Sequence, residues 1–559
     1  MLSEFRDYAR SALHDDLLAA AIVSVLLIPQ SLAYALLAGL PPQVGLYASL
    51  LPLVAYAALG SSPLLCVGPV AVLALMISQA LAHLPADVGA QAGALVLAAE
   101  VGLLLAAAAW LRLDALASLL SVPVLHGFET GATLSIALSQ LPLLLGAPVR
   151  GSNLPQLLGA WWQAPSAWQP LTALYGGGAL LALWLARRHA VRVLARWMSA
   201  SRAAMLVRLA PLAVLMLAVG AATLTDAGTH GVALVGALPE LAPRIGLPPL
   251  AAALWWQLLP SALLVALVTF VSSLVVAESL GRRQGTRVEP RRELAGLAAA
   301  NLAAALSSGM PVAGSFSRSV VNLDAGSRTR MVGVFTALFM ALAIVLLARP
   351  LAALPAAVLA ATIIVAVLSV LDWRPFRQAW LYSRSEGVLM SVVAALTLAQ
   401  GVGWALGVGV AASIALLLQR TARPHVALIG RVAGTEHYRN VGRHEVQLTP
   451  SVMALRIDES LLFTNARQLV DVVQQQLGQA SGTQRLVLLM SPVNRIDFSG
   501  LAALRALHDT LAARGIRLDL SEVKGPVLDA LHAGDWSQWF AGRVYLSHHQ
   551  AMLDAPTGR

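Results

Sequence analysis

The sequence predicts a polytopic α-helical membrane protein that ends in a small cytoplasmic α/β domain. Three observations support this fold class. Hydrophobic residues make up 58% of the 559 residues and charged residues only 12%, whereas soluble proteins average about 25% charged residues. Apolar segments continue from about residue 16 to about residue 418, which is more than one soluble core could hold. From Arg420 onward the chain is more polar, and apolar runs alternate with amphipathic stretches.

The first apolar segment, residues 16–49, is long enough to enter a bilayer but carries polar groups. Gln30, Ser31 and Tyr34 fall at membrane depth, and the sequence Gly-Leu-Pro-Pro then breaks the helix. Polar side chains and backbone breaks inside lipid are tolerated where they line a cavity or another helix. A simple membrane anchor does not need them, so this segment favours a transport function.

The placement of arginine predicts the membrane topology. Clusters of Arg alternate with loops that are nearly free of it, such as residues 225–252 with only Arg244. The positive-inside rule then places both termini in the cytoplasm and requires an even number of spans. We expect residues 1–15 to be a cytoplasmic segment without a cleavable signal peptide. The same rule explains the net charge of +10 and argues against nucleic-acid binding. Candidate spans begin near residues 16, 43, 69, 90, 121, 170, 207, 254, 291, 315, 329, 351, 386 and 403.

Two segments are too short and too polar to cross a membrane fully. Residues 66–71 and residues 310–319 each place Gly and Pro at the start of a short helical run, where a helix exposes free N–H groups. Interrupted segments in corresponding positions of two halves indicate an inverted-repeat transporter. Two facing helix N-termini form an anion site, and Arg318 would add a full positive charge there. The alternative is a pair of ordinary Gly/Pro kinks, which their paired placement disfavours.

Glu278 lies in a predicted span, about one turn before Arg282. A carboxylate at membrane depth is unfavourable unless it is paired, protonated or in a wet cavity. Our hypothesis is that Glu278 binds the coupling proton. The alternative is a structural salt bridge to Arg282 or Arg318.

These segments resemble a known family. Residues 16–49 resemble the first-helix signature of the sulfate permease (SulP) family of anion transporters, which includes the vertebrate anion exchangers and prestin. Residues 121–146, 309–334 and 354–372 are similar to the fifth, tenth and twelfth helices of that family. Residues 438–467 are similar to the start of its cytoplasmic STAS domain. The matches follow one another in order along nearly the whole chain.

The resemblance implies 14 transmembrane segments, arranged as two inverted repeats of seven helices and divided into a core and a gate domain. The transport domain would be residues 16–419, with the repeats at about 16–225 and 253–419. A linker at 420–436 and a STAS domain at 437–559 would follow. The family usually forms homodimers, and we expect this chain in a bacterial inner membrane.

The resemblance also assigns binding residues by position. The anion would lie between the starts of the third and tenth helices. Backbone N–H groups would come from Val70, Ala71, Phe316 and Ser317, the first helix would contribute Gln30 and Tyr34, and Arg318 matches the basic position of the tenth helix. Proton-coupled relatives carry a glutamate at the position of Glu278, whereas a sodium-coupled bicarbonate relative carries an aspartate.

The C-terminal region alternates between strands and helices. We expect strands at 452–457, 486–490 and 516–520, and helices at 465–477 and 500–514. The stretch 494–500 resembles the STAS loop whose serine accepts phosphate in soluble relatives, so Ser499 is a possible regulatory phosphosite. A plain helix cap at Ser499 is the alternative that we favour. The single cysteine, Cys66, and the scattered histidines give no metal site, and we expect no cofactor.

Together these observations predict a secondary active transporter of a small inorganic or carboxylate anion, and not an enzyme. Proton-coupled sulfate uptake by alternating access is our first expectation. Sodium-coupled bicarbonate transport and proton-coupled C4-dicarboxylate transport are alternatives, so the coupling ion would be H⁺ or else Na⁺. Other classes that the sequence leaves open are a membrane-anchored STAS signalling protein without transport, a nucleobase permease and an uncoupled channel. A cytoplasmic protein partner of the STAS domain is also expected.

Overall fold

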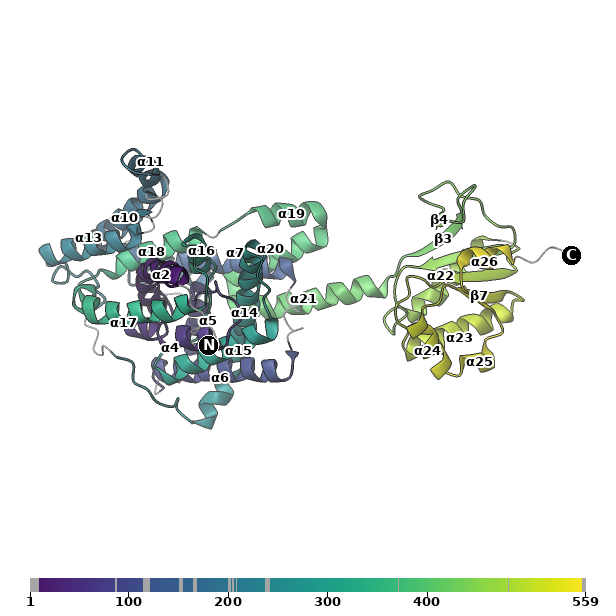
Figure 1. The fold of residues 1–559 in the computed structure, drawn as a ribbon, viewed down its shortest axis with the longest axis horizontal. Coiled ribbons are helices and arrows are strands. Elements are labelled where there is room, and N and C mark those ends of the chain that lie inside the picture. Colours follow the sequence, from purple (N-terminus) through teal and green to yellow (C-terminus); the bar gives the residue numbers. More distant parts are fainter. Residues whose placement is uncertain are drawn as a thin grey trace. The chain divides into compact units, whose positions relative to one another are not determined.

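A computed structural model describes most of the chain (Figure 1). The described residues are 10–85, 88–113, 121–149, 154–163, 168–199, 203, 206–207, 209–236, 242–369, 371–480 and 482–554. The chain divides into two compact units, Met1–Ser413 and Ile414–Arg559, so the division falls inside a long helix, α21 (Val402–Ala422). Residues 1–9 of the predicted N-terminal segment and residues 555–559 of the predicted STAS domain lie outside the described residues.

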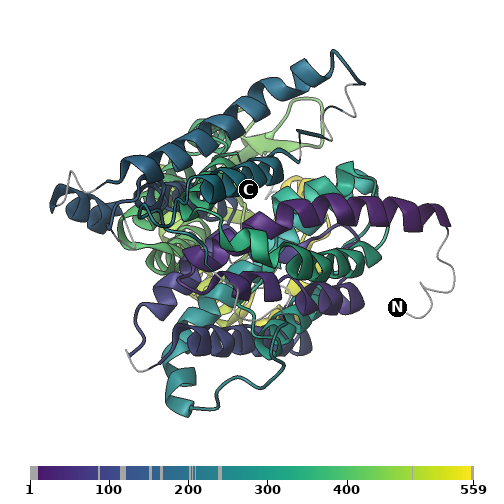
Figure 2. The same cartoon turned by 90° about the vertical axis from the view of Figure 1, so that its left-hand side faces the viewer.

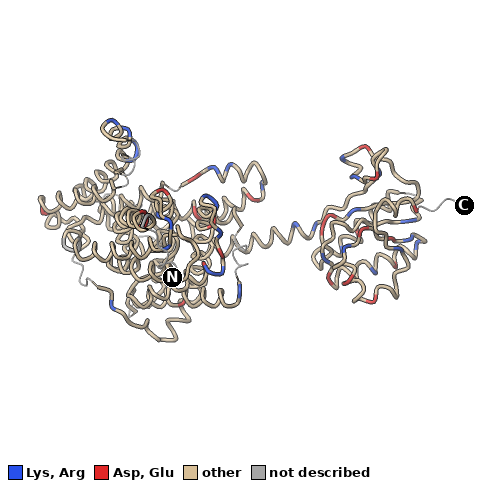
Figure 3. Tube along the Cα trace, viewed as in Figure 1, with Lys and Arg blue, Asp and Glu red and all other residues tan. Residues whose placement is uncertain are grey.

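The first unit is helical, and a helix begins close to each of the 14 predicted span starts. Six helices of the described residues are long and apolar enough to cross a membrane. The helices of the first half of this unit are α2 (Arg10–Leu37), α3 (Pro42–Tyr47), α4 (Leu51–Leu59), α5 (Ala71–Leu81), α6 (Ala90–Trp110), α7 (Val122–Ser139), α8 (Leu141–Leu145), α9 (Leu154–Gln163), α10 (Pro170–Leu185), the π-helix Ala186–Ala190, α11 (Val191–Leu194) and α13 (Ala210–Leu224). Those of the second half are α14 (Ala252–Gln284), α15 (Pro290–Leu306), α16 (Phe316–Asp324), α17 (Met331–Ala352), α18 (Ala356–Leu368), α19 (Arg374–Tyr382), α20 (Arg384–Gln400) and α21. Charged residues are sparse along these helices and gather near their ends (Figure 3).

The helices of the two halves pack against each other. Helix α2 packs against α17, and both α4 and α6 pack against α15. In the same way α7 packs against α20, and α10 packs against α18. Figure 2 shows the same unit from the side. Small residues permit these approaches. A Cβ on Gly127 would lie 2.4 Å from the carbonyl oxygen of Met390, and one on Gly131 would lie 2.7 Å from that of Ala394. The core of the unit is therefore formed jointly by both halves.

A buried carboxylate also connects α15 with α4 and the loop that follows α4. Glu293 of α15 is fully buried. Its Oε2 accepts a hydrogen bond from the Tyr56 hydroxyl at 2.7 Å, and its Oε1 accepts from the backbone N–H groups of Ser61 at 3.1 Å and Ser62 at 2.8 Å. A buried carboxylate is stable only when such donors replace water.

The second unit is an α/β domain. Its six-stranded sheet has the order β4-β3-β5-β6-β7-β8. Strands β5 to β8 run parallel, whereas β3 pairs antiparallel with both β4 and β5. The strands are β3 (Val426–Arg431), β4 (Tyr438–Asn440), β5 (Val452–Ile457), β6 (Arg485–Leu489), β7 (Arg517–Ser521) and β8 (Val544–Tyr545). The helices are α22 (Ala466–Gln479), α23 (Phe498–Ala512), α24 (Gly525–Ala533), α25 (Trp536–Trp539) and α26 (His548–Leu553). The three strands and two helices expected here are confirmed within a few residues.

The sheet carries an apolar core on each face. The larger core includes the Leu455 and Leu488 side chains of the sheet and Leu504 of α23, and the smaller one joins the sheet to α26 through Ala551 and Met552. The alternation of side chains along each strand sends neighbouring residues to opposite faces. Because both faces of the sheet are covered, the apolar runs of β5 and β6 in the sequence are explained.

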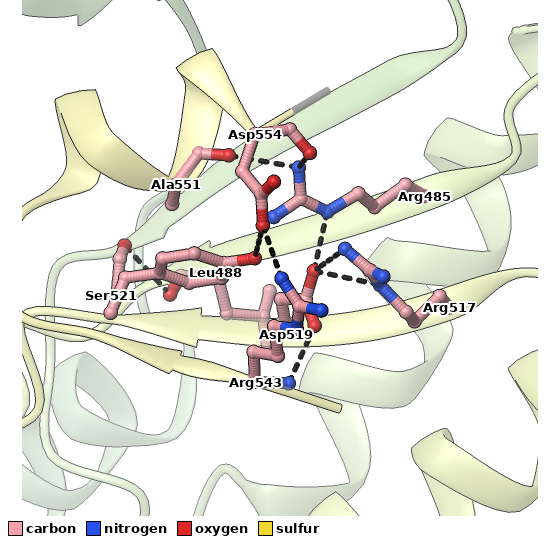
Figure 4. A network of polar contacts seen from close by, with 9 residues as sticks. Arg485, Leu488, Arg517, Asp519, Ser521, Arg543, Ala551 and Asp554 are labelled. Carbon is pink, nitrogen blue, oxygen red and sulfur yellow. Dashed lines mark hydrogen bonds and ion pairs between the residues drawn. The ribbon is translucent and has the colours of Figure 1, made fainter. Parts of the chain in front are cut away.

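A buried ionic network holds the last helix of this domain (Figure 4). Arg485 of β6 is 1% exposed and pairs through Nε with the fully buried carboxylate of Asp519 in β7. Its Nη1 donates to the carbonyl oxygens of Ala551 at 2.8 Å and Asp554 at 3.0 Å. Asp519 also accepts a hydrogen bond from the backbone N–H of Arg543 at 2.7 Å. The network therefore ties the centre of the sheet to the end of α26.

Candidate functional site

The two interrupted segments meet at the centre of the first unit. Strand β1 (Val67–Gly68) pairs antiparallel with β2 (Ala313–Gly314), with Val67 opposite Gly314 and Gly68 opposite Ala313. The backbone N–H of Ser315 also donates to the carbonyl oxygen of Cys66 at 3.0 Å. Segments almost 250 residues apart in the sequence thus share one small ladder.

Each strand of this ladder leads into a short helix. Helix α5 has 11 residues and follows β1, whereas α16 has 9 residues and follows β2. Val70 and Ser315 are the N-cap residues, both in extended conformation, and Pro69 precedes the cap instead of occupying the first helical position. The expectation of a proline inside the first turn is therefore wrong, but the short helices start from one common ladder. The first N–H groups of a helix have no intrahelical partner and carry partial positive charge.

The residues expected to supply backbone N–H groups lie at these helix starts. Ala71 is the first residue of α5, and Phe316 and Ser317 are the first two residues of α16. Phe316 and Ser317 have exposed side chains, and Val70 and Ala71 are partly exposed. The two helix starts are therefore accessible to an ion from this side of the ladder.

Arg318 is the most unusual side chain of the site. It is only 1% exposed, in the first turn of α16. Its Nη1 donates to Oε1 of Gln30 at 3.0 Å, whereas the buried Nε and Nη2 have no hydrogen-bond partner among the described residues. A Cβ on Gly68 would lie 3.3 Å from Nη2, so a residue without a side chain is needed where the guanidinium passes β1. A buried charge with unmet donors is unfavourable until an anion joins it.

Helix α2 places two more of the expected residues beside Arg318. Gln30 is partly buried and accepts the hydrogen bond from Arg318, and Tyr34 lies one turn further along α2 and is buried. The guanidinium acts electrostatically on the Tyr34 hydroxyl and on the Cys66 thiol, which therefore lie close to it. The structure thus brings together Gln30, Tyr34 and Arg318 next to the ladder.

Sequence reasoning missed the side chains that hold this geometry. The hydroxyl of Ser319 accepts a hydrogen bond from the N–H of Cys66 at 2.9 Å, and that of Ser273 accepts from the N–H of Gly314 at 2.8 Å. Asn301 bonds both backbone groups of Val312, through Oδ1 at 2.9 Å and Nδ2 at 3.0 Å. All three side chains are fully buried. The available signal was a polar residue inside an apolar helix, as at Ser273 in α14 and Asn301 in α15.

Glu278 lies on α14, which packs against β2 and α16. It lies six residues before the end of that helix at Gln284. Its side chain is 43% exposed and forms a loose ion pair with Arg282, with Oε2 3.7 Å from Nη1. The expected alternative, a contact with Arg282, is therefore present.

The structure also corrects the reading of Ser499. Asp497 is the N-cap of α23, and its side chain accepts a hydrogen bond from the N–H of Gly500 at 2.8 Å. Ser499 is exposed inside the first turn, so the favoured interpretation as a helix cap is wrong. The described residues contain no group of three or more His, Cys, Asp or Glu side chains that could hold a metal ion.

A ladder that joins two half-helices in a bundle of apolar helices, followed by an α/β domain, defines a multi-pass membrane transporter with an appended STAS domain. The chain belongs to the sulfate permease family: the family model matches residues 13–393, and the STAS domain model matches residues 443–551. A probable sulfate transporter of Mycobacterium tuberculosis is 33% identical over 539 residues, which cover 95% of this chain and 93% of the relative. Sulfate transporter 4.1, chloroplastic, of Arabidopsis thaliana is 30% identical, over 95% of this chain and 79% of its own length.

Solved structures agree with this fold. The murine anion transporter Slc26a9, in its inward-facing state, superposes with a TM-score of 0.88 at 22% identity, over 99% of this chain and 93% of that one. The transmembrane domain of the cyanobacterial bicarbonate transporter BicA superposes with a TM-score of 0.59 at 22% identity, over 73% of this chain and 98% of that one. The predicted fold class is therefore confirmed. Membership of the sulfate permease family makes the chain an anion transporter and not an enzyme.

Proposed function

We propose that the chain is a secondary active transporter that takes up sulfate together with protons. The observation that carries the proposal is Arg318, a buried guanidinium beside two helix N-termini, with two nitrogens that have no hydrogen-bond partner among the described residues. Guanidinium groups bind tetrahedral oxyanions through paired hydrogen bonds, and helix starts bind anions through N–H groups. Sulfate has four acceptor oxygens and can use both kinds of donor at once.

Binding would involve the residues already placed at the ladder. Sulfate would lie against Arg318 and the N–H groups of the two helix starts. The proposed anion-binding residues are Gln30, Tyr34, Val70, Ala71, Phe316, Ser317 and Arg318. The hydrogen bond from Arg318 to Gln30 holds the guanidinium in place before the ion arrives. Preorganisation of this kind lowers the entropy loss on binding.

Coupling would involve Glu278. Its side chain is 43% exposed, and its helix contacts the ladder through Ser273. A proton on Glu278 would remove one negative charge from the loaded transporter, which favours movement of a dianion across the low-dielectric layer. The core carrying the ladder would then move against the gate as a rigid body and alternate access between the two sides.

Bicarbonate is the second candidate, because the membrane unit shares its fold with a bicarbonate transporter. In that case the coupling ion would be Na⁺, and a C4-dicarboxylate with protons is the third possibility for the same donor set. Sulfate is preferred because the relatives that are 30 to 33% identical are named sulfate transporters. We further propose that the chain works as a homodimer in a bacterial inner membrane with both termini in the cytoplasm.

The test is uptake of labelled sulfate into proteoliposomes, with and without an inward proton gradient. Unlabelled bicarbonate, fumarate and succinate serve as competitors. The proposal expects uptake that the gradient stimulates and that Arg318→Gln abolishes, while the exposed control Arg514→Gln retains it. Sodium-dependent uptake with competition by bicarbonate would select the second candidate. No uptake of any of these anions by folded protein would refute the transport function and revive the interpretation as a membrane-anchored signalling protein.

A further inference from the structure

The STAS domain contains a polar pocket that is separate from the transport site. It has a volume of about 390 Å³ and lies where the start of β3, the end of β4 and the end of β5 converge. The lining residues, here called the basic pocket, are His425, Arg439, Asn440, Arg443, His444, Arg456 and Asp458. Three arginines and two histidines thus face one carboxylate, and every lining side chain is polar.

Asp458 is already engaged by two of these residues. Its carboxylate accepts hydrogen bonds from Arg456, at 2.5 Å from Nε and 2.9 Å from Nη2, and contacts Nδ1 of His425 at 2.8 Å. Partial burial opposes ionisation of Asp458, but the hydrogen bonds from Arg456 and His425 outweigh it and lower the pKa of the carboxyl group. Asp458 is therefore ionised and fixed to the wall of the pocket at neutral pH.

Two positive charges in the basic pocket are left without a counterion. The guanidinium groups of Arg439 and Arg443 are exposed and have no hydrogen-bond or ion-pair partner within the described part of the chain. The backbone fixes where they stand, because Arg439 pairs with Gly430 in the β3–β4 ladder and the N–H of Arg443 donates to the carbonyl oxygen of Asn440 at 3.1 Å. Like charges gathered in a concave surface attract an anion from solution.

We propose that the basic pocket binds the phosphate group of an anionic ligand, which is either a lipid headgroup or a soluble phosphate compound. Two guanidinium groups match the charge and the oxygen geometry of a phosphate. The volume exceeds that of a single inorganic ion and leaves room for the group that carries the phosphate. A lipid source is feasible because His425 follows the end of the membrane-length helix α21 by only three residues. A ligand here would thus be bound by residues near the start of the STAS domain in the sequence.

The first arm of the test measures soluble phosphate. Full-length protein in a neutral detergent is titrated calorimetrically with inorganic pyrophosphate. Wild type is expected to bind, and the double variant R439Q/R443Q is expected to bind at least tenfold more weakly. The matched control Arg514→Gln, which changes another exposed arginine of the domain, should bind as wild type does. Arg318→Gln should also leave this binding unchanged, which separates the basic pocket from the transport site.

The second arm measures lipid. The same proteins are purified with added phosphatidylglycerol and examined by native mass spectrometry for retained lipid. Retention by wild type and Arg514→Gln, and loss in R439Q/R443Q, would assign a lipid headgroup even if pyrophosphate does not bind. If neither probe binds, or if the double variant binds both as wild type does, the proposal is overturned. The single variant Arg443→Gln, expected to weaken binding several-fold, keeps the test decisive if the double variant is unstable.

Discussion

Nη1 of Arg318 donates to Oε1 of Gln30 at 3.0 Å, across 288 positions of the sequence. The bond joins α16, from the second half of the membrane unit, to α2, from the first. Among the described residues, the other two nitrogens of this guanidinium, Nε and Nη2, have no hydrogen-bond partner. The orientation of the Arg318 guanidinium, which is proposed to bind the anion, therefore depends on a residue of the opposite half.

Gln30→Ala should weaken sulfate binding without abolishing transport. Loss of one hydrogen bond to a charged group is worth about 1.5 kcal/mol, so KM for sulfate should rise about tenfold while the maximal rate stays within a factor of two. Uptake kinetics in proteoliposomes measure both values. Gln43→Ala, in the neighbouring α3, is the matched control and should behave as wild type. An unchanged KM in the Gln30 variant would contradict the orienting role.

Glu278→Gln should remove the stimulation of uptake by an inward proton gradient, because the amide cannot bind the coupling proton. Arg282→Gln should retain that stimulation, since the ion pair between the two is loose and half exposed, and such pairs are worth less than about 1 kcal/mol. Uptake at a series of external pH values distinguishes the two variants. Equal impairment of both would identify Glu278 as a structural partner of Arg282 only.

Asp519→Asn should strongly destabilise the STAS domain. The substitution leaves the buried guanidinium of Arg485 without its counterion, and breaking a buried pair in this way destabilises by about 3–5 kcal/mol. Arg517, which contacts the same carboxylate at 2.9 Å, is 41% exposed, so Arg517→Gln should lose about 1 kcal/mol or less. Hydrogen exchange of β6 and β7 in the full chain measures the difference. Equal protection in both variants would show that burial does not set the strength of this network.

His548 should make the end of the STAS domain sensitive to acid. Burial lowers the pKa of His548 from 6.5 to about 4, so the folded domain binds fewer protons than the unfolded chain. This contribution to stability is complete above pH 6.5, falls as the pH decreases, and is lost below about pH 4; at pH 5 the loss is about 2 kcal/mol. Hydrogen exchange in α26, corrected for the intrinsic effect of pH, should therefore accelerate between pH 7 and pH 5.

The control for this prediction is His548→Gln, which removes the titrating group at the contact with Ser521. Exchange in α26 of this variant should respond less to the same change of pH. The neighbouring His549 remains in both proteins. If wild type and variant respond alike, protonation of His548 does not control the stability of α26.

Much of the fold was predictable because the dominant forces are local in the sequence. Apolar runs and their breaks predicted the span starts, and the structure has a helix near each of them. The alternation of strands and helices after Arg420 predicted the C-terminal α/β domain. The two short segments were also recognisable, since Gly and Pro interrupt apolar runs at 66–71 and 310–319. These patterns reflect burial and backbone conformation, and both depend on the type of each residue.

The details of the site were less predictable because they depend on pairing between distant segments. No local pattern states that Val67 lies opposite Gly314, or that Asn301 bonds both backbone groups of Val312. The sequence left open whether Glu278 pairs with Arg282, and the structure shows that contact. The cap of α23 was misassigned for a similar reason, since Asp497 and Ser499 are both suitable cap residues and only the backbone decides between them.

The ladder between β1 and β2 also constrains how the protein is made. During synthesis β1 is complete long before β2 leaves the ribosome, so the first half must enter the bilayer with an unpaired strand edge. Insertion of the second half then closes the edge, and the anion site lacks Arg318 and the start of α16 until that moment. A chain truncated between α13 and α14 would for this reason be an incomplete biosynthetic intermediate, whereas the two halves expressed together as separate chains carry everything needed to restore the ladder.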